Sequence, residues 1–171
     1  FEFGFAKGKG VYVSSDDSKS KGEYEDGKLH GQGYEIWPDG SKYRGEYKNG
    51  MKDGKGLFEW EDGSSYEGSM KENNLHGKGF YKWKDGRTYD GEFENNKMNG
   101  KGVFTWPDGR VYEGEYIDDK KEGYGEYSWP DGRIYKGPWK NGKQHGEAEY
   151  TNSKGQTRRG VWENGKKISK C

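Results

Sequence analysis

Aliphatic side chains are scarce in this sequence of 171 residues. Only nineteen residues are Leu, Ile, Val or Phe, and the hydrophobic share of 27% includes an aromatic share of 16%. So small an aliphatic share is typical of disordered chains, but those chains also carry a high net charge, whereas here 30 basic residues balance 30 acidic ones. The few aliphatic side chains cannot fill the centre of an ordinary globular domain.

Cysteine and long apolar runs are nearly missing as well. A single cysteine, Cys171, excludes a disulfide framework, and it has no neighbouring histidine or base that would make it a nucleophile. No run approaches the roughly 20 apolar residues of a membrane span, and no signal-peptide segment is present. The zero net charge provides no general attraction to polyanions. One thiol is typical of a reducing compartment, so we expect a cytoplasmic protein.

Glycine is the residue in excess, with 31 copies that all follow a period of 23 residues. The glycines fall into five columns, and no insertion interrupts the period. One of these columns contains Gly22, Gly45, Gly68, Gly91, Gly114, Gly137 and Gly160. A fixed period of this length indicates a repeat protein.

The aromatic residues follow the same period. Tyr43 and its equivalents stand two residues before a glycine, and Tyr47 and its equivalents stand two residues after it. Even spacings place these rings and glycines on one face of a strand and the charged residues between them on the other face. Rings laid over glycine backbone then supply the core, since each ring buries roughly 150–250 Å². Within the array only Glu35 and Met70 replace a column aromatic.

Two kinds of turn separate the aromatic segments. Pairs such as Asn49-Gly50 tolerate positive φ and stand between the two strands of a unit. Segments such as Pro38-Asp39-Gly40 join one unit to the next. We therefore predict an all-β fold, an elongated single-layer twisted antiparallel array of consecutive β-hairpins.

Each unit follows one pattern, which from residue 43 is Tyr-x-Gly-x-Tyr and from residue 54 is Gly-x-Gly-x-Phe-x-Trp-x-Asp-Gly. This pattern resembles the MORN repeat, named for membrane occupation and recognition nexus. Six windows in register cover residues 20–157, between a truncated half-repeat at 1–19 and a C-terminal half-repeat or basic cap at 158–171. The resemblance implies a non-catalytic scaffold or protein–protein interaction module of a eukaryotic cytoskeletal, ciliary or membrane-associated structure. Some arrays of this family form homodimers through their terminal repeats.

The two ends depart from the pattern. Phe1 aligns with Tyr24 and Gly4 with Gly27, so the sequence begins inside a hairpin, and we expect it to be a piece of a longer array. The linker from Ser14 to Ser20 lacks the tryptophan and the turn glycine. In the last unit the consensus residues are replaced by Ala148, Asn152, Lys154 and Arg158.

The eroded last unit is our candidate for self-association or partner docking. Pro138 lacks a backbone donor, which suits an edge strand or an unpaired position. We predict that Pro138, Trp139 and Trp162 contribute to a self-association end, because terminal repeats of an array present exposed edges.

The C-terminal segment is basic although the whole chain is neutral. Residues 154–171 contain six Lys and Arg against one Glu, a net charge of +5, which leaves −5 for residues 1–153. This end is either a solvated basic tail or a contact for an acidic partner or an anionic phospholipid headgroup. The candidate contact residues are Arg158, Arg159, Lys166, Lys167 and Lys170.

The sequence offers no catalytic, cofactor or metal site, and we expect no enzyme. Each Gly-x-Gly is followed by a strand pattern and not by a helix that could cradle a phosphate. His30, His76 and His145 share one column, but strands lie ~4.8 Å apart, which separates His30 from His76 by about 20 Å and excludes a shared zinc ion. Repeated carboxylates such as Glu46 are expected on a solvated face. Because rings and charges are expected on opposite faces, no nucleic-acid binding is predicted.

Two further functions stay open. The family name and the basic end are consistent with a phospholipid- or membrane-binding module. Similar arrays also accompany lipid kinases and a lysine methyltransferase, so the chain could be the regulatory region of a larger enzyme.

Overall fold

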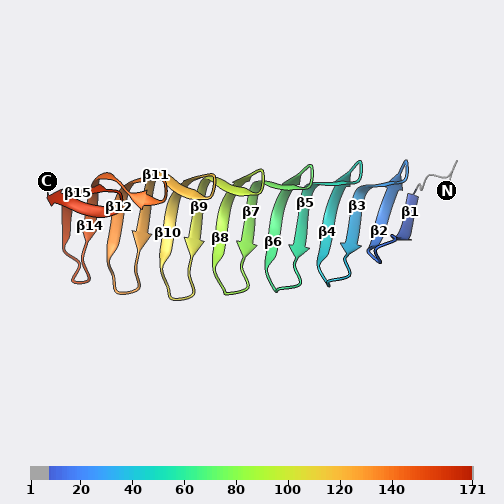
Figure 1. Cartoon of the computed structure of the whole chain (residues 1–171), viewed down its shortest axis with the longest axis horizontal. Helices are drawn as coiled ribbons and strands as arrows, with labels where there is room; N and C mark the ends of the chain where they lie inside the picture. Colours follow the sequence, from blue (N-terminus) through green and yellow to red (C-terminus); the bar gives the residue numbers. More distant parts are fainter. Residues whose placement is uncertain (1–7, 171) are drawn as a thin grey trace. The chain divides into compact units, whose positions relative to one another are not determined.

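The computed structural model describes residues 8–170, and the side chain of Lys170 lies outside that description. These residues form short strands joined by tight turns (Figure 1). The strands are β1 (Gly8–Val13), β2 (Lys19–Glu25), β3 (Lys28–Ile36), β4 (Lys42–Lys48), β5 (Met51–Glu59), β6 (Ser65–Lys71), β7 (Asn74–Lys82), β8 (Thr88–Glu94), β9 (Lys97–Thr105), β10 (Val111–Ile117), β11 (Lys120–Ser128), β12 (Ile134–Lys140), β13 (Lys143–Gln144), β14 (Gly146–Thr151), β15 (Thr157–Glu163) and β16 (Lys166–Lys170).

Consecutive strands pair antiparallel, and their order in the sheet follows the chain, with the short β13 paired to β12 beside the main path. The chain divides into two compact units, of which the first holds β1 to β7 and the second holds β8 to β16. Each unit is a layer of consecutive hairpins, which confirms the predicted fold class. Within residues 8–170 there is no helix with the length and apolarity to cross a lipid bilayer.

Tyrosines that lie over paired glycines build the core of each unit. Tyr66 is fully buried, and its hydroxyl donates a 2.7 Å hydrogen bond to the carbonyl of Ser69. Its ring covers Gly79, which pairs with Gly68 across β6 and β7. A Cβ on Gly79 would lie 2.2 Å from the Tyr66 hydroxyl oxygen, so only glycine fits beneath the ring. The same arrangement recurs at Tyr43, Tyr89 and Tyr112, whereas beside Tyr135 the buried Ala148 stands in place of the covered glycine.

A β-bulge lies in the second strand of the hairpins, opposite the residue that follows the paired glycine of the first strand. Between β4 and β5 the pairing shifts from Gly45 to Tyr47, which leaves Glu46 unpaired in the ladder. The Glu46 carboxylate accepts a hydrogen bond from the backbone N–H of Lys55 on the second strand. The same bond is made by Glu23 to Gln32, by Glu92 to Lys101 and by Glu115 to Tyr124. These carboxylates therefore lie on an exposed face, as predicted, and each one also accepts a hydrogen bond from a backbone N–H.

The two predicted turn types are both present. Asn49 and Gly50 adopt φ of 51° and 82°, as the asparagine–glycine pair predicts. Successive hairpins are also tied at these turns. Asn73 donates its backbone N–H to the Lys52 carbonyl at 2.9 Å, and the Asn73 side-chain oxygen accepts the Lys52 N–H at 2.8 Å. In the second type of turn, the N–H of Gly63 donates to the Trp60 carbonyl at 3.0 Å.

The structure decides between the two alternatives for Pro138. Strand β12 has neighbours on both sides, so the edge alternative is wrong. Pro138 holds the position opposite the bulge that Glu115 occupies one repeat earlier, and β12 pairs with β14 only through Ile134 to Lys136. A residue without an N–H is tolerated at such an interruption of the ladder.

The deviant first linker forms a tight turn. Strand β1 ends at Val13, and the N–H of Ser14 donates to the carbonyl of Ser18 at 2.9 Å. Ser20, in place of the opening tyrosine, lies 2.6 Å from the Tyr24 hydroxyl through its own side-chain oxygen. The alignments made for Phe1 and Gly4 lie outside the described residues.

Candidate interaction face

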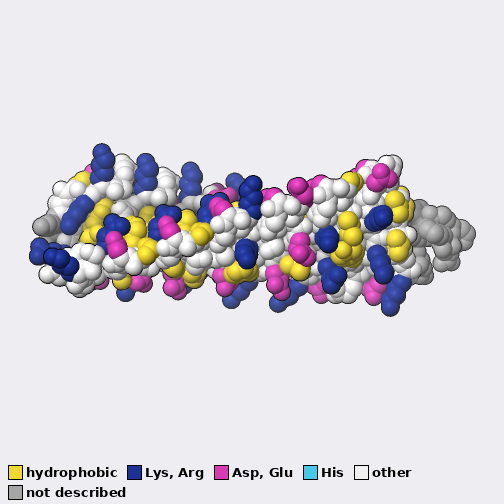
Figure 2. Space-filling view, turned by 90° about the horizontal axis from the view of Figure 1, so that it is seen from below, with side chains coloured by type: hydrophobic (Ala, Val, Ile, Leu, Met, Phe, Trp, Pro, Cys, Tyr) yellow, Lys and Arg dark blue, Asp and Glu magenta, His cyan; other side chains and the backbone are white. Residues whose placement is uncertain are grey.

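Aromatic rings gather on one face of the sheet in each unit, and we call this surface the ring face. Neighbouring rings in the first unit have centroids 4.3 to 5.4 Å apart, in the order Trp37, Phe58, Trp60, Tyr81 and Trp83. Neighbouring rings in the second unit have centroids 4.5 to 5.5 Å apart, in the order Phe104, Trp106, Tyr127 and Trp129. The tryptophans of both series are half-buried, so they remain open to solvent on one side. Figure 2 shows hydrophobic side chains gathered over the second unit with Lys and Arg among them.

Lys52, in β5, lies on the ring face of the first unit. Its Nζ lies 5.1 to 5.7 Å from the ring centroids of Trp37, Tyr43 and Phe58. Glu35 Oε1 lies 3.9 Å from this Nζ and also accepts a 2.6 Å hydrogen bond from the Tyr47 hydroxyl. The Lys52 charge is therefore balanced by a carboxylate of the chain itself.

Lys121, in β11, lies on the ring face of the second unit. Its Nζ lies 5.3 to 5.8 Å from four ring centroids, and with those rings it forms what we call the Lys121 cage. The rings are those of Trp106, Tyr112, Tyr127 and Trp139. Among the described residues, no carboxylate lies within ion-pair distance of Lys121.

The two lysines hold equivalent positions three repeats apart. Lys52 pairs with Tyr47 across its hairpin, and Lys121 pairs in the same way with Tyr116. The position of Glu35 is taken by Phe104 in the later repeat. The later site therefore keeps the lysine and the tyrosine but lacks the acid.

Burial lowers the pKa of both lysines, because water is partly replaced around their amines by ring surfaces. Beside Lys52, the carboxylate of Glu35 acts in the opposite direction and raises the pKa. Beside Lys121, the guanidinium of Arg110 lowers the pKa further. The neighbouring charge is thus negative beside Lys52 and positive beside Lys121.

Two arginines also lie on the ring face of the second unit. The guanidinium carbon of Arg110 lies 4.9 Å from the Trp106 ring centroid, and that of Arg133 lies 4.9 Å from the Trp129 centroid. Each arginine is held by the aspartate of its turn, with Nε 2.8 Å from Asp108 in the case of Arg110. The prediction that rings and charges occupy opposite faces is therefore wrong at these positions. The even spacing of Lys121 to Tyr127 already places this lysine on the ring face, in a column that from residue 29 onward holds leucine, methionine, glutamine or lysine.

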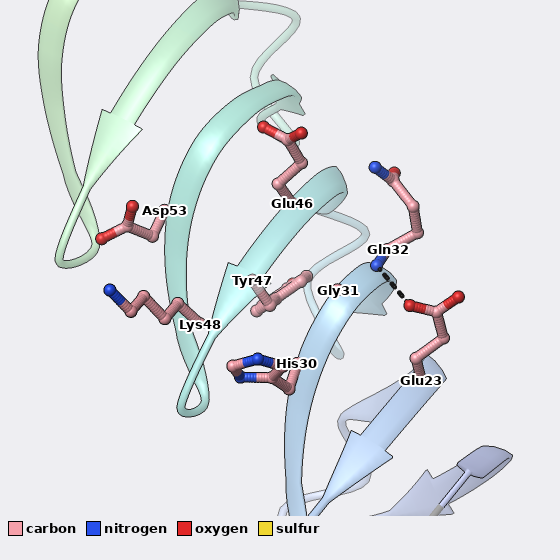
Figure 3. Close-up of a pocket in the computed structure, with 8 residues that line it drawn as sticks. All are labelled: Glu23, His30, Gly31, Gln32, Glu46, Tyr47, Lys48 and Asp53. Carbon is pink, nitrogen blue, oxygen red and sulfur yellow. Dashed lines mark hydrogen bonds between the residues drawn. The ribbon is translucent and has the colours of Figure 1, made fainter.

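A hollow on the opposite face of the first unit is lined by Glu23, His30, Gly31, Gln32, Glu46, Tyr47, Lys48 and Asp53 (Figure 3). Two of its polar side chains accept hydrogen bonds from backbone N–H groups. Glu23 accepts the N–H of Gln32 at 3.1 Å, and His30 Nδ1 accepts the N–H of Asn49 at 3.2 Å. This hydrogen bond gives His30 a structural role at the turn. Across the described part of the chain, no group of His, Cys, Asp and Glu residues is arranged to hold a metal ion.

The MORN repeat family model matches residues 1–19, 21–42, 43–65, 66–86, 89–109, 112–132 and 135–157. The chain belongs to the MORN-repeat family. No curated protein sequence matches it significantly.

Solved structures with a similar fold exist. The MORN-repeat chain resembles the TCP10 domain of Danio rerio CPAP, with 15% identity over 95% of this chain and 78% of that domain and a TM-score of 0.50. It also resembles that domain in complex with a peptide of Danio rerio STIL, with 14% identity over 94% of this chain and 72% of that one and a TM-score of 0.53. At these identities the likeness concerns the fold.

The structure does not bring the predicted basic residues of the MORN-repeat chain together. In β15, Arg158 lies on the side of Trp162 and Arg159 on the other side, where it pairs with Glu147 at 3.1 Å. Lys167 lies opposite Trp162 in the ladder, with Nζ 5.6 Å from its ring, whereas Lys166 lies opposite Glu163. The side chain of Lys170 is outside the described residues.

The predicted self-association residues belong to the core of the second unit. Trp139 and Trp162 are buried, and both rings contact Tyr135, with centroids 5.2 and 5.1 Å away. The indole N–H of Trp139 donates to the Gly125 carbonyl at 3.2 Å. Self-association of the MORN-repeat chain stays a prediction. Because Trp139 and Trp162 are buried, they would hold such an interface in shape from below and would not contact the second copy directly.

Proposed function

We propose that this MORN-repeat chain is a non-catalytic protein-interaction module that binds a segment of a partner protein on its ring face. The observation that carries the proposal is the series of half-buried tryptophans with arginines stacked on them in the second unit. Tryptophan and arginine dominate the binding energy of protein interfaces, because they combine large apolar area with directional donors.

The similar fold of the CPAP domain that takes a STIL peptide supports a peptide segment as the partner. The cellular setting that we propose, a cytoskeletal, ciliary or membrane-associated structure, rests on the family resemblance alone. An open sheet surface with repeated side-chain positions suits such a partner, since repeat arrays present long surfaces for extended chains.

The experiment is selection of a displayed library of short random peptides on the unmodified chain. The selected peptides are then measured on a Trp129→Ala variant and on a Glu113→Ala control, whose substitution lies on the opposite face. We expect Trp129→Ala to weaken binding about tenfold or more and the control to leave it unchanged. Failure to select any peptide, or equal binding to both variants, would contradict the proposed function.

A further inference from the structure

Comparison of the two lysine sites shows which group the later one lacks. At Lys52, one carboxylate receives both the ammonium charge and the Tyr47 hydroxyl, at 3.9 and 2.6 Å. At Lys121, the same two donors are present as the ammonium and the hydroxyl of Tyr116, but Phe104 stands where Glu35 stands in the earlier repeat. Tyr116 and Phe104 are both buried, whereas Lys121 is half-buried, so the Lys121 ammonium is the group that an outside molecule can reach.

The nearest acidic residue of the turn is already engaged. Asp108 holds the Nε of Arg110 at 2.8 Å and accepts the Arg110 backbone N–H at 3.0 Å. Arg110 in turn donates to the Tyr127 hydroxyl at 3.2 Å, which fixes the guanidinium beside the cage. Arg110 and Lys121 therefore both lie beside Trp106 and Tyr127, but only Arg110 has an acidic partner.

We propose that the Lys121 ammonium, at the open side of the Lys121 cage, binds the carboxylate of an Asp or Glu side chain in the partner segment. This inference rests on the proposed function and adds the chemistry by which the partner is recognised. A carboxylate pairs with an ammonium beside aromatic rings, as Glu35 does with Lys52 in the first unit. The apolar walls reduce the local dielectric constant, so the attraction exceeds that of an exposed ion pair.

The experiment uses the peptides selected on the unmodified chain, synthesised with amidated C termini so that only side chains carry carboxylates. Each peptide is made in its acidic form and with its Glu or Asp changed to Gln or Asn. Dissociation constants are measured by fluorescence anisotropy on the unmodified chain, on Lys121→Met and on Lys52→Met. We expect neutralisation of one acidic position to weaken binding to the unmodified chain about tenfold, and to have little effect on Lys121→Met. Lys52→Met is the matched control and keeps the full discrimination, because Glu35 already occupies that site.

A second pair of variants tests the site without removing the lysine. Phe104→Glu places a carboxylate in the position that Glu35 holds, so it should occupy the cage and abolish the preference for acidic peptides. Phe104→Gln is the neutral control of similar size and should retain that preference. Thermal unfolding followed by circular dichroism verifies that each variant is folded.

The outcomes separate the two proposals. Selected peptides that bind on the ring face with no discrimination between acidic and neutral forms overturn the carboxylate site and leave the proposed function standing. Discrimination that persists in Lys121→Met or in Phe104→Glu also overturns the carboxylate site. Failure to select any peptide overturns both.

Discussion

The Tyr47 hydroxyl donates a 2.6 Å hydrogen bond to Glu35, a carboxylate that occupies a column of aromatic residues. The departure is coupled to a second residue, because Glu35 also balances the charge of Lys52, which stands where Leu29 and Leu75 stand in the neighbouring repeats. A substitution that looks like decay of the pattern is therefore part of a half-buried polar cluster.

The coupling predicts the stability of variants at these two positions. Glu35→Ala leaves the Tyr47 hydroxyl and the Lys52 ammonium without an acceptor, and we expect a loss of about 2 kcal/mol in the free energy of unfolding. The double variant Glu35→Phe with Lys52→Leu restores the repeat consensus and should recover most of that loss. Urea unfolding followed by circular dichroism measures both, and a double variant as unstable as Glu35→Ala would refute the coupling.

The glycine beneath Tyr66 predicts a steep cost for a single methyl group. Gly79→Ala places a Cβ against the Tyr66 ring and hydroxyl, so we expect destabilisation of about 2 kcal/mol or more. Gly10→Ala is the matched control, since its Cβ would meet the Tyr24 ring only at ordinary contact distance, 3.9 Å. Similar unfolding midpoints for the two variants would be inconsistent with this core.

Alkaline pH should unfold the protein through its buried tyrosines. Burial raises the pKa of Tyr66, Tyr89 and Tyr135 to about 12, from an ordinary value of 10.0. In the folded state these groups hold their protons between pH 10 and 12 while the unfolded chain loses them. The stability that they contribute is complete below pH 10 and is lost as pH rises, by about 1.4 kcal/mol per pH unit for each tyrosine. Tyrosinate absorbance should rise together with the loss of the circular dichroism signal, and gradual ionisation of the folded chain would contradict the prediction.

The division of the basic end over two faces predicts weak membrane attachment. Arg158 and Lys167 lie on the side of Trp162, and Arg159 and Lys166 lie on the opposite side, so a flat bilayer cannot contact all four together. Cosedimentation with vesicles containing phosphatidylserine should show little bound protein at low and at moderate salt. Strong binding that is lost in an Arg158→Glu, Lys167→Glu variant would favour the phospholipid alternative instead.

The periodic part of the fold is predictable because it depends on local rules. Even spacing decides which face a residue occupies, and Asn49-Gly50 selects a turn with positive φ. The glycine columns indicate where rings such as Tyr66 must lie on backbone.

The parts that sequence reasoning missed depend on contacts between a side chain and residues of other strands. Glu46 looks like a surface residue in the pattern, and only the bulge opposite it shows that its carboxylate satisfies the Lys55 N–H. Lys121 shares the even spacing of the ring face, but the identity of its neighbours comes from strands on either side. Contacts between residues of different repeats cannot be obtained from the period of one repeat.

The most direct test of the ring face as the binding surface is nuclear magnetic resonance of the tryptophan indole N–H groups during titration with a peptide selected on the chain. The account predicts that the indole signals of Trp106 and Trp129 shift with peptide concentration, while the backbone signals of Glu46 and Glu92 on the opposite face stay in place. Shifts confined to the opposite face or to residues 158–170, with the Trp106 and Trp129 signals unchanged, would contradict it.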